Sequence, residues 1–217
     1  MHVCAFIQAR MSSNRFPGKM LAPFRGRPLV DHVVEAVRRG VPDSKVVLVT
    51  SRELSDDPLV AHAEKRGYEV FRGPLDDVLG RFRAALDARD PTAEWVLRIC
   101  GDSPILSASV IRRVVAAARP DLDLVTTIEE RTFPHGQNAE LISAAVLRAL
   151  DDDKNLSAHH REHVTQGIHQ NRAKYRVLNV TSGDPTLATR RHAVDTVDDL
   201  LRLEKADLAT ELAGVEE

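Results

Sequence analysis

The chain has 217 residues and a mass of 24.0 kDa, which suits one domain with a continuous core and leaves little room for a second. Its 30 basic and 32 acidic residues give a formal charge of −2, so it has no global field that would gather nucleic acid or a membrane surface. We therefore expect a single domain over residues 1–217 without nucleic-acid or membrane partners.

Cysteine content and hydropathy indicate the compartment. Cys4 and Cys100 are too few for a disulfide framework, and both lie in apolar runs where a small buried thiol is common. No stretch approaches the ~20 apolar residues that span a bilayer, and the amino terminus shows no basic region followed by an apolar signal segment. These features predict a cytoplasmic protein.

Taken in chain order, short apolar runs alternate with amphipathic segments of helix length. The expected strands span residues 3–8, 45–50, 69–71, 95–99, 122–127, 175–180 and 187–194. The expected helices span residues 28–39, 57–66, 76–88, 107–118, 143–152, 161–171 and 198–212. Such alternation is typical of βα units that build a mostly parallel sheet, so the sequence predicts an α/β fold.

The loop over residues 9–21 follows the first strand, and in an α/β sheet ligands bind at the carboxyl ends of strands. It contains Arg10, Arg15 and Lys19 together with Ser13, and residues 1–27 hold no Asp or Glu. Fixed charges, hydroxyl donors and free backbone N–H groups are what a triphosphate needs. The spacing is neither that of a Walker A loop nor Gly-x-Gly-x-x-Gly, so from composition alone a hydrated basic surface loop explains it equally well.

A family resemblance is carried by six sequence blocks in order along the chain. They read IQARMSSNRFPGKML, VFRGPLDDVLGRF, VLRICGDSPIL, TFPHG, REHVTQGIHQN and HAVDTVDDL. In these blocks the chain resembles the cytidylyltransferase family that includes the sialic-acid- and Kdo-activating enzymes, and most closely its SpsF-like branch of spore-coat polysaccharide biosynthesis. The resemblance implies a Rossmann-like, mostly parallel sheet flanked by helices, of the nucleotide-diphospho-sugar transferase type.

The resemblance also implies a reaction, in which an acceptor oxygen attacks the α-phosphorus of CTP with Mg²⁺ as cofactor and pyrophosphate is released. It implies a homodimer, with residues 128–175 as the acceptor and dimerisation segment. The residues that match the nucleotide-binding motifs are Ala9, Arg10, Ser13, Arg15, Lys19, Arg72, Gly73, Asp77, Gly101 and Asp102. Among them Arg10, Lys19 and Asp102 form the catalytic set, since Arg10 and Lys19 would neutralise charge on the departing pyrophosphate.

Two aspartates are the candidate ligands for Mg²⁺, a hard cation that prefers oxygen ligands. Asp102 follows the expected strand 95–99, and Asp195 ends the apolar run before the last expected helix. The resemblance implies that Asp102 contacts the metal and that Asp195 completes the site. From the residue pattern alone, a turn before Pro104 and a helix cap explain the two positions.

The resemblance places Arg72, Gly73 and Asp77 beside the nucleotide base, with Arg81 one turn further on. Asp77 has an alternative role as an acid in the first turn of a helix. Arg98 is a cation in an otherwise apolar strand, so it needs either a carboxylate partner or a ligand.

The acceptor half departs from the family. Where many SpsF-like proteins have Pro-Asp-Gly-x-Asp-x-Glu, this chain has His135 and Asn138 in place of two carboxylates. We hypothesise that the loss of two negative charges adapts the pocket to an acceptor with a carboxylate, phosphate or phosphonate. The candidate acceptor-binding residues are Phe133, His135, Gln137, Glu140, Arg161 and His163.

Three alternatives stand beside this interpretation. Residues 159–163 match His-x-x-Glu-His, a zinc-protease pattern, although no third ligand helix follows. A nucleotide-sugar-dependent glycosyltransferase would hold its metal with Asp-x-Asp, and residues 121–123 have that spelling but begin an expected strand. The third alternative is a nucleotide-binding module without catalysis.

Overall fold

The computed structural model describes residues 1–216, so the last residue of the expected domain lies outside the described part. Its centre is a seven-stranded sheet in the order β5-β4-β1-β6-β8-β7-β9. The strands are β1 (Val3–Gln8), β4 (Lys45–Ser51), β5 (Glu69–Gly73), β6 (Trp95–Cys100), β7 (Leu124–Thr126), β8 (Ala139–Ser143) and β9 (Val177–Asn179). β8 runs antiparallel to β6 and β7, and the other pairings of this sheet are parallel. The expected α/β fold with a mostly parallel sheet is confirmed.

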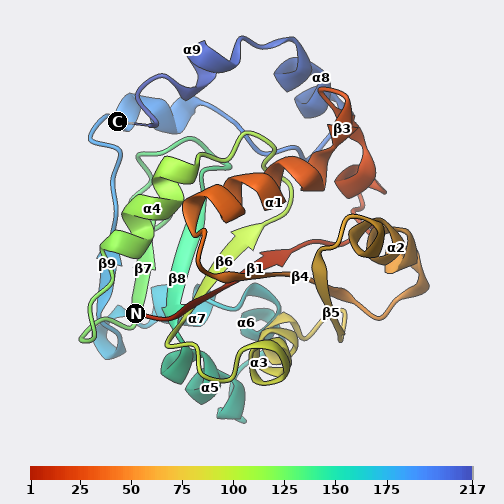
Figure 1. The fold of residues 1–217 in the computed structure, drawn as a ribbon. Coiled ribbons are helices and arrows are strands. Elements are labelled where there is room, and N and C mark those ends of the chain that lie inside the picture. The colour runs from red at the N-terminus through yellow and green to blue at the C-terminus, as the bar shows by residue number, and fades with distance from the viewer. Residues whose placement is uncertain (217) are drawn as a thin grey trace.

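Helices cover both faces of the sheet (Figure 1). One layer contains α1 (Leu29–Gly40), α2 (Asp57–Lys65) and α4 (Ala108–Ala116). The other layer contains α3 (Val78–Arg89), α5 (Ala144–Asp152) and α7 (Gln166–Gln170). In β1, Ala5 and Ile7 pack in the first core, whereas Cys4 and Phe6 pack in the second. Because both faces are buried, the strands read as continuous apolar runs.

The remaining elements are short. They are the hairpin β2 (Pro23–Phe24) and β3 (Arg27–Pro28), the helices α6 (Ala158–His163), α8 (Val197–Lys205) and α9 (Leu208–Leu212), and the 3₁₀ turns Lys19–Leu21, Leu54–Asp56, Arg172–Lys174 and Pro185–Thr189. Figure 1 shows α8 and α9 lying beyond α1 at the edge of the molecule. Of the helices within residues 1–216, none is long and apolar enough to cross a bilayer.

Two strand predictions are corrected. The strand expected over residues 187–194 is wrong, because this stretch is a 3₁₀ turn followed by a loop with one bridge, between His135 and Arg191. Its apolar residues Leu187 and Val194 are buried one by one in the core. Conversely β8 was not expected, since Glu140 interrupts its short apolar run.

Two expected helices are each divided. The helix expected over residues 161–171 breaks at Val164, whose φ of 53° ends α6 before α7 begins. The helix expected over residues 198–212 stops at Ala206, and Asp207 then caps α9 by accepting hydrogen bonds from the backbone N–H groups of Ala209 and Thr210. Both breaks end a helix where periodicity alone would continue it.

Candidate active site

The loop after β1 is held by its own backbone and by one buried carboxylate. The Gly18 N–H donates to the Met11 carbonyl at 2.9 Å, and Gly18 has a φ of 79°, which glycine adopts without strain. Asp56 is fully buried and accepts hydrogen bonds from the Met11 N–H at 2.6 Å and the Thr50 hydroxyl at 2.8 Å. Burial alone would raise the pKa of Asp56, but hydrogen bonds from Ser51, Met11 and Thr50 hold that pKa below its usual value. The sequence did not single out Asp56 as a residue that holds this loop, because an aspartate before a helix is a common cap.

The two predicted metal ligands meet at the ammonium group of Lys19. Its Nζ lies 2.9 Å from Asp102 Oδ2 and 3.4 Å from Asp195 Oδ1, and it donates to the Val194 carbonyl at 2.8 Å. Arg15 Nη2 lies 3.0 Å from the same Asp195 oxygen. Asp102 follows β6 and Asp195 precedes α8, so residues from distant parts of the sequence share one cation.

The approach of Asp195 to Asp102 depends on close backbone packing. The Val194 N–H donates to the Asp102 carbonyl at 2.8 Å, which aligns the two segments. Gly136 lies against the same segment with a φ of 111°, and a Cβ at this position would lie 2.5 Å from Ala193 N. A side chain at residue 136 would therefore displace the backbone segment that leads to Asp195.

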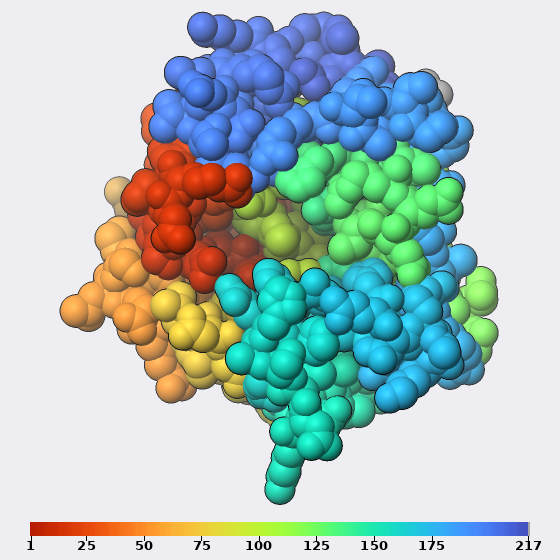
Figure 2. Space-filling model, turned by 180° about the vertical axis from the view of Figure 1, so that it is seen from behind, coloured from red at the N-terminus to blue at the C-terminus, as the bar shows by residue number. Residues whose placement is uncertain are grey.

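A cavity of about 320 Å³ opens at this junction. Its lining is Gln8, Arg10, Ser13, Asn14, Arg15, Lys19, Met20, Cys100, Asp102 and Asp195. Figure 2 shows the hollow on this face, with the red amino-terminal segment on one side, the yellow-green segment around residue 100 at its floor and blue carboxyl-terminal residues along its upper rim. Ala9 and Gly101 lie side by side behind it, since a Cβ on Gly101 would be 3.0 Å from the Ala9 Cβ.

The donor set at the junction suits a divalent metal. Carboxylate oxygens are the ligands that Mg²⁺ prefers, and here two carboxylates converge on one cation. The side chains of Asp102 and Asp195 keep 24% and 17% of their surface exposed, so they can be reached from the cavity. Within residues 1–216 no three His, Cys, Asp or Glu side chains form a metal-binding group, so a metal here would complete its shell with water or phosphate oxygens.

Arg72 lies outside the set that lines this cavity. Its guanidinium donates to the Ser51 carbonyl at 2.9 Å and the Glu53 carbonyl at 3.0 Å, and it pairs with Asp57 at 2.7 Å. These contacts hold the loop between β4 and α2. Its predicted role at the base stays a prediction.

Gly73 is required by the packing of Arg81. A Cβ on Gly73 would lie 2.6 Å from the Arg81 Cγ. The Arg81 side chain is fully buried and donates to the carbonyl groups of Pro74 and Leu75, and burial lowers the pKa of Arg81 to about 10. Arg81 therefore supports the turn after β5 from behind.

Asp77 and Arg161, predicted for the base and the acceptor, bind one another. Arg161 Nε and Nη2 donate to the two Asp77 carboxylate oxygens at 2.9 Å each, and Nη2 also pairs with Asp151. Asp77 in addition caps α3 through the Gly80 N–H. The structure thus uses this pair to join α6 to α3.

The other predicted acceptor residues separate into buried and accessible positions. Phe133 and Gln137 are fully buried, so they support the site from within the core. His135 is partly exposed, and burial lowers the pKa of its imidazole below the usual value. His163 lines a second cavity of about 240 Å³.

Arg98 finds a carboxylate partner. It pairs with Glu140, its cross-strand neighbour in β8, and also donates to Gln8 Oε1 at 3.2 Å. Glu140 is buried and accepts further hydrogen bonds from the Thr165 hydroxyl and from His169 Nε2, at 3.0 Å each. The strand position of Arg98 signalled this need for a partner, but not which residue would supply it.

The structure also shows where the Asp-x-Asp motif of the glycosyltransferase alternative and the His-x-x-Glu-His motif of the zinc-protease alternative lie. Asp123 precedes β7 and accepts a hydrogen bond from the Arg176 N–H at 2.8 Å. Since β6 and β7 both run antiparallel to β8, Asp123 lies at the opposite edge of the sheet from Asp102. The rings of His159 and His163 lie 4.5 Å apart on α6.

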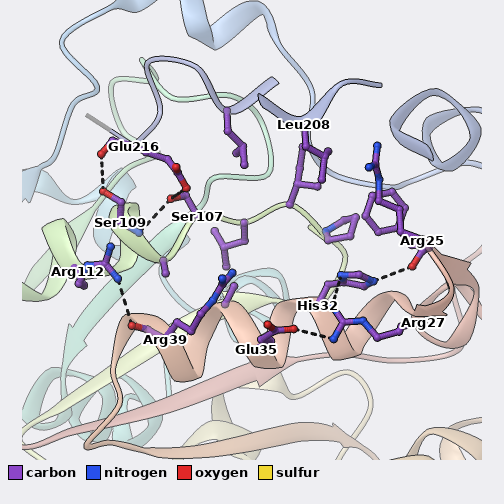
Figure 3. Close-up of a pocket in the computed structure, with 17 residues that line it drawn as sticks. Arg25, Arg27, His32, Glu35, Arg39, Ser107, Ser109, Arg112, Leu208 and Glu216 are labelled. Carbon is purple, nitrogen blue, oxygen red and sulfur yellow. Dashed lines mark hydrogen bonds and ion pairs between the residues drawn. The ribbon is translucent and has the colours of Figure 1, made fainter. Parts of the chain in front are cut away.

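A larger cavity of about 700 Å³ lies between α1, α4 and α9 and has a different lining (Figure 3). Two of its cations are engaged by the protein itself. Arg27 pairs with Glu35 at 2.8 Å, and Arg112 donates to the Arg39 carbonyl at 3.3 Å. The paired carboxylates and the loop after β1 belong to the smaller cavity, so the candidate active site is assigned there.

A cationic loop after β1 and paired carboxylates at the same edge of a mostly parallel sheet define the class: a Rossmann-like α/β nucleotidyltransferase. The family described as Cytidylyltransferase matches residues 4–212. The chain belongs to this cytidylyltransferase family.

Individual relatives agree with that membership. The chain is 33% identical to the spore coat polysaccharide biosynthesis protein SpsF of Bacillus subtilis over 198 residues, which are 89% of this chain and 81% of that protein. It is 32% identical to a 3-deoxy-manno-octulosonate cytidylyltransferase of Anaeromyxobacter dehalogenans over 153 residues, 70% of this chain and 61% of that protein.

Solved structures share the fold. A cytidylyltransferase from Leptospira borgpetersenii superposes with a TM-score of 0.89 at 24% identity, covering 100% of this chain and 94% of that one. A CMP:2-keto-3-deoxy-manno-octonic acid synthetase complexed with CTP superposes with a TM-score of 0.69 at 16% identity, covering 94% and 97%.

Proposed function

We propose that the protein transfers CMP from CTP to a hydroxylated or anionic acceptor and releases pyrophosphate, with Mg²⁺ held by Asp102 and Asp195. The observation that carries this proposal is the meeting of both carboxylates at Lys19 Nζ, in a cavity that Arg10 and Arg15 also line. Membership of the cytidylyltransferase family supports CTP as the nucleotide.

The cationic side of the cavity suits a triphosphate. Arg10, Arg15 and Lys19 supply three positive charges there, and Ser13 adds a hydroxyl group. A bound Mg²⁺ would neutralise charge on the phosphate oxygens. Arg10 and Lys19 would stabilise the charge that develops on the leaving pyrophosphate, a contribution that fixed cations make without reorganisation.

The acceptor is proposed to carry an anionic group, as an acidic sugar, a phosphate or a phosphonate does. Arg131 Nη1 donates to Asn138 Oδ1 at 2.8 Å, so this cation is matched to a neutral amide at one of the two positions where many relatives have a carboxylate. The other position is His135. With both carboxylates replaced, the charge of Arg131 is available to an anion.

Pyrophosphate release from CTP and Mg²⁺ with a panel of neutral and anionic acceptors tests the proposal. We expect turnover with anionic acceptors, and CTP to raise the melting temperature more than the other three nucleoside triphosphates do. Asp102→Asn should lower kcat by about 100-fold or more. Asp123→Asn, at the opposite edge of the sheet, is the matched control.

Each part of the proposal can fail separately. Equal turnover of neutral and anionic acceptors would remove the basis for the acceptor class. A protein that shows neither a CTP-selective thermal shift nor pyrophosphate release would contradict the reaction itself.

A further inference from the structure

The second cavity adjoins the nucleotide cavity. Its lining is Arg98, Ile128, His163, Thr165, Gln166 and His169. Arg98 links the two cavities. It lines this one, and its guanidinium donates at 3.2 Å to Gln8 Oε1; Gln8 lines the other. A ligand in the second cavity would therefore lie beside the nucleotide.

A strained turn forms part of its wall. Val164 has a φ of 53° and a ψ of −68°, and the Thr165 N–H donates to the His163 carbonyl at 2.6 Å. This is a γ-turn of the rare, strained kind, and β-branched residues seldom adopt it. Such strain persists where the surrounding structure enforces it, and it clusters at functional sites. Here the turn starts α7 so that Thr165, Gln166 and His169 line the cavity.

His169 is oriented by a buried carboxylate. Its Nε2 lies 3.0 Å from Glu140 Oε1. Burial alone would raise the pKa of Glu140, but the charge of Arg98 and hydrogen bonds from His169 and Thr165 hold that pKa below its usual value. An ionised carboxylate can only accept hydrogen bonds, so Nε2 carries a proton. In the neutral imidazole Nδ1 is then the nitrogen that can accept a hydrogen bond.

Two side chains that line this cavity each have a buried polar atom without a hydrogen-bond partner in the described part of the chain. His169 Nδ1 and Gln166 Oε1 are buried and have no hydrogen-bond partner within residues 1–216. A buried acceptor without a hydrogen-bond partner destabilises the protein. Both atoms accept hydrogen bonds, so a ligand that supplies hydroxyl donors matches them.

We propose that the second cavity binds the hydroxylated part of the acceptor, and that His169 is a catalytic residue that takes the proton of the attacking hydroxyl group. This inference rests on the proposed function. The acceptor oxygen forms its bond to the α-phosphorus of CTP, while the bond from that phosphorus to the oxygen shared with the β-phosphate breaks. Pyrophosphate leaves with that electron pair. The hydroxyl proton passes to His169 Nδ1, and Glu140, a positioning residue, stabilises the imidazolium.

His169→Gln tests the assignment, since the glutamine amide can still donate to Glu140 but has no basic nitrogen. We expect kcat to fall by about 100-fold or more, while the Kd for CTP and the melting temperature stay unchanged. The decline of the wild-type rate at acidic pH should disappear in this variant. Glu140 contacts the His169 imidazole, and Arg98 and His163 line the same cavity. The pH profile of His163→Gln is therefore measured alongside, and it should keep the decline at acidic pH.

His2→Gln is the matched control, because His2 precedes β1 and so lies at the opposite end of the strand that leads into the site. His169→Ala covers the case in which His169→Gln does not fold. Added imidazole should restore part of its rate, which it would not do for a residue with a structural role alone. Gln166→Leu should raise the acceptor KM by about tenfold with little change in kcat, as the loss of one hydrogen bond predicts.

The outcomes separate the two proposals. If wild-type protein releases pyrophosphate and His169→Gln retains kcat within threefold, or His169→Ala gains nothing from imidazole, the role of His169 is overturned and the proposed function stands. If wild-type protein releases no pyrophosphate with any acceptor, both are overturned. A large loss of kcat in His169→Gln with unchanged CTP binding supports the assignment.

Discussion

Replacing Lys19 by methionine probes the junction on which the site is built. The change keeps the length of the side chain and removes the cation that Asp102 and Asp195 share, at 2.9 Å and 3.4 Å. Removing one partner of a buried ion pair costs about 3–5 kcal/mol, and since both aspartates are partly exposed to solvent we reduce this to about 2 kcal/mol. At about 2–4 °C per kcal/mol for a chain of this size, the melting temperature should fall by about 4–8 °C.

The same variant predicts a response to metal and a loss of rate. Two carboxylates without their ammonium group repel one another, so Mg²⁺ at about 30 times its Kd should restore about 2 kcal/mol. Loss of one fixed charge on the leaving group should lower kcat by about 100- to 1,000-fold. Thermal denaturation with and without Mg²⁺ and an assay of pyrophosphate release measure these effects.

Lys45→Met is the control for this experiment. Lys45 is the first residue of β4 and donates to the Arg89 carbonyl at 2.7 Å on the exposed surface, so its loss should leave both the melting temperature and kcat near their wild-type values. The reasoning is refuted if Lys19→Met melts within about 1 °C of the wild type and keeps its rate. The absence of any gain in melting temperature from Mg²⁺, in the variant and in the wild type alike, would show that the two carboxylates do not form a metal site.

Arg161→Ala should lower stability by about 1 kcal/mol through loss of the partly exposed pair with Asp77 and leave the acceptor KM within threefold; a raised KM at an unchanged melting temperature would instead support its predicted acceptor role. Burial lowers the pKa of His192 from 6.5 to about 4, so its contribution to stability is complete above pH 6.5 and is lost as the pH falls towards 4. Urea unfolding should show a loss of about 2 kcal/mol between pH 8 and pH 5 that His192→Asn reduces, and an equal loss in the variant would contradict it. Burial raises the pKa of Cys4 to about 12 and that of Cys100 to about 11, so iodoacetamide at pH 8 should modify neither thiol until the protein is unfolded, as mass spectrometry would show.

Local patterns account for most of the fold. The strands β1, β4 and β6 consist mostly of apolar residues, and α1 repeats its apolar residues at helical spacing, so each element can be predicted from its own residues. β8 could not be predicted from its apolar residues, because Glu140, which forms a buried ion pair with Arg98, interrupts them. Over residues 187–194 a strand was predicted where none forms, since single apolar residues of a loop can be buried without any strand.

By itself the sequence determined the α/β class, the cationic loop after β1 and the aspartates that follow β6 and precede α8, because strand ends and helix starts are local features of the chain. Only the tertiary structure decided which of these residues share a partner. In the structure Asp102 and Asp195 both contact Lys19. Arg161 pairs with Asp77, and His169 contacts Glu140. Those contacts depend on strand order, register and a strained turn, which join segments far apart in the chain and which no local pattern encodes.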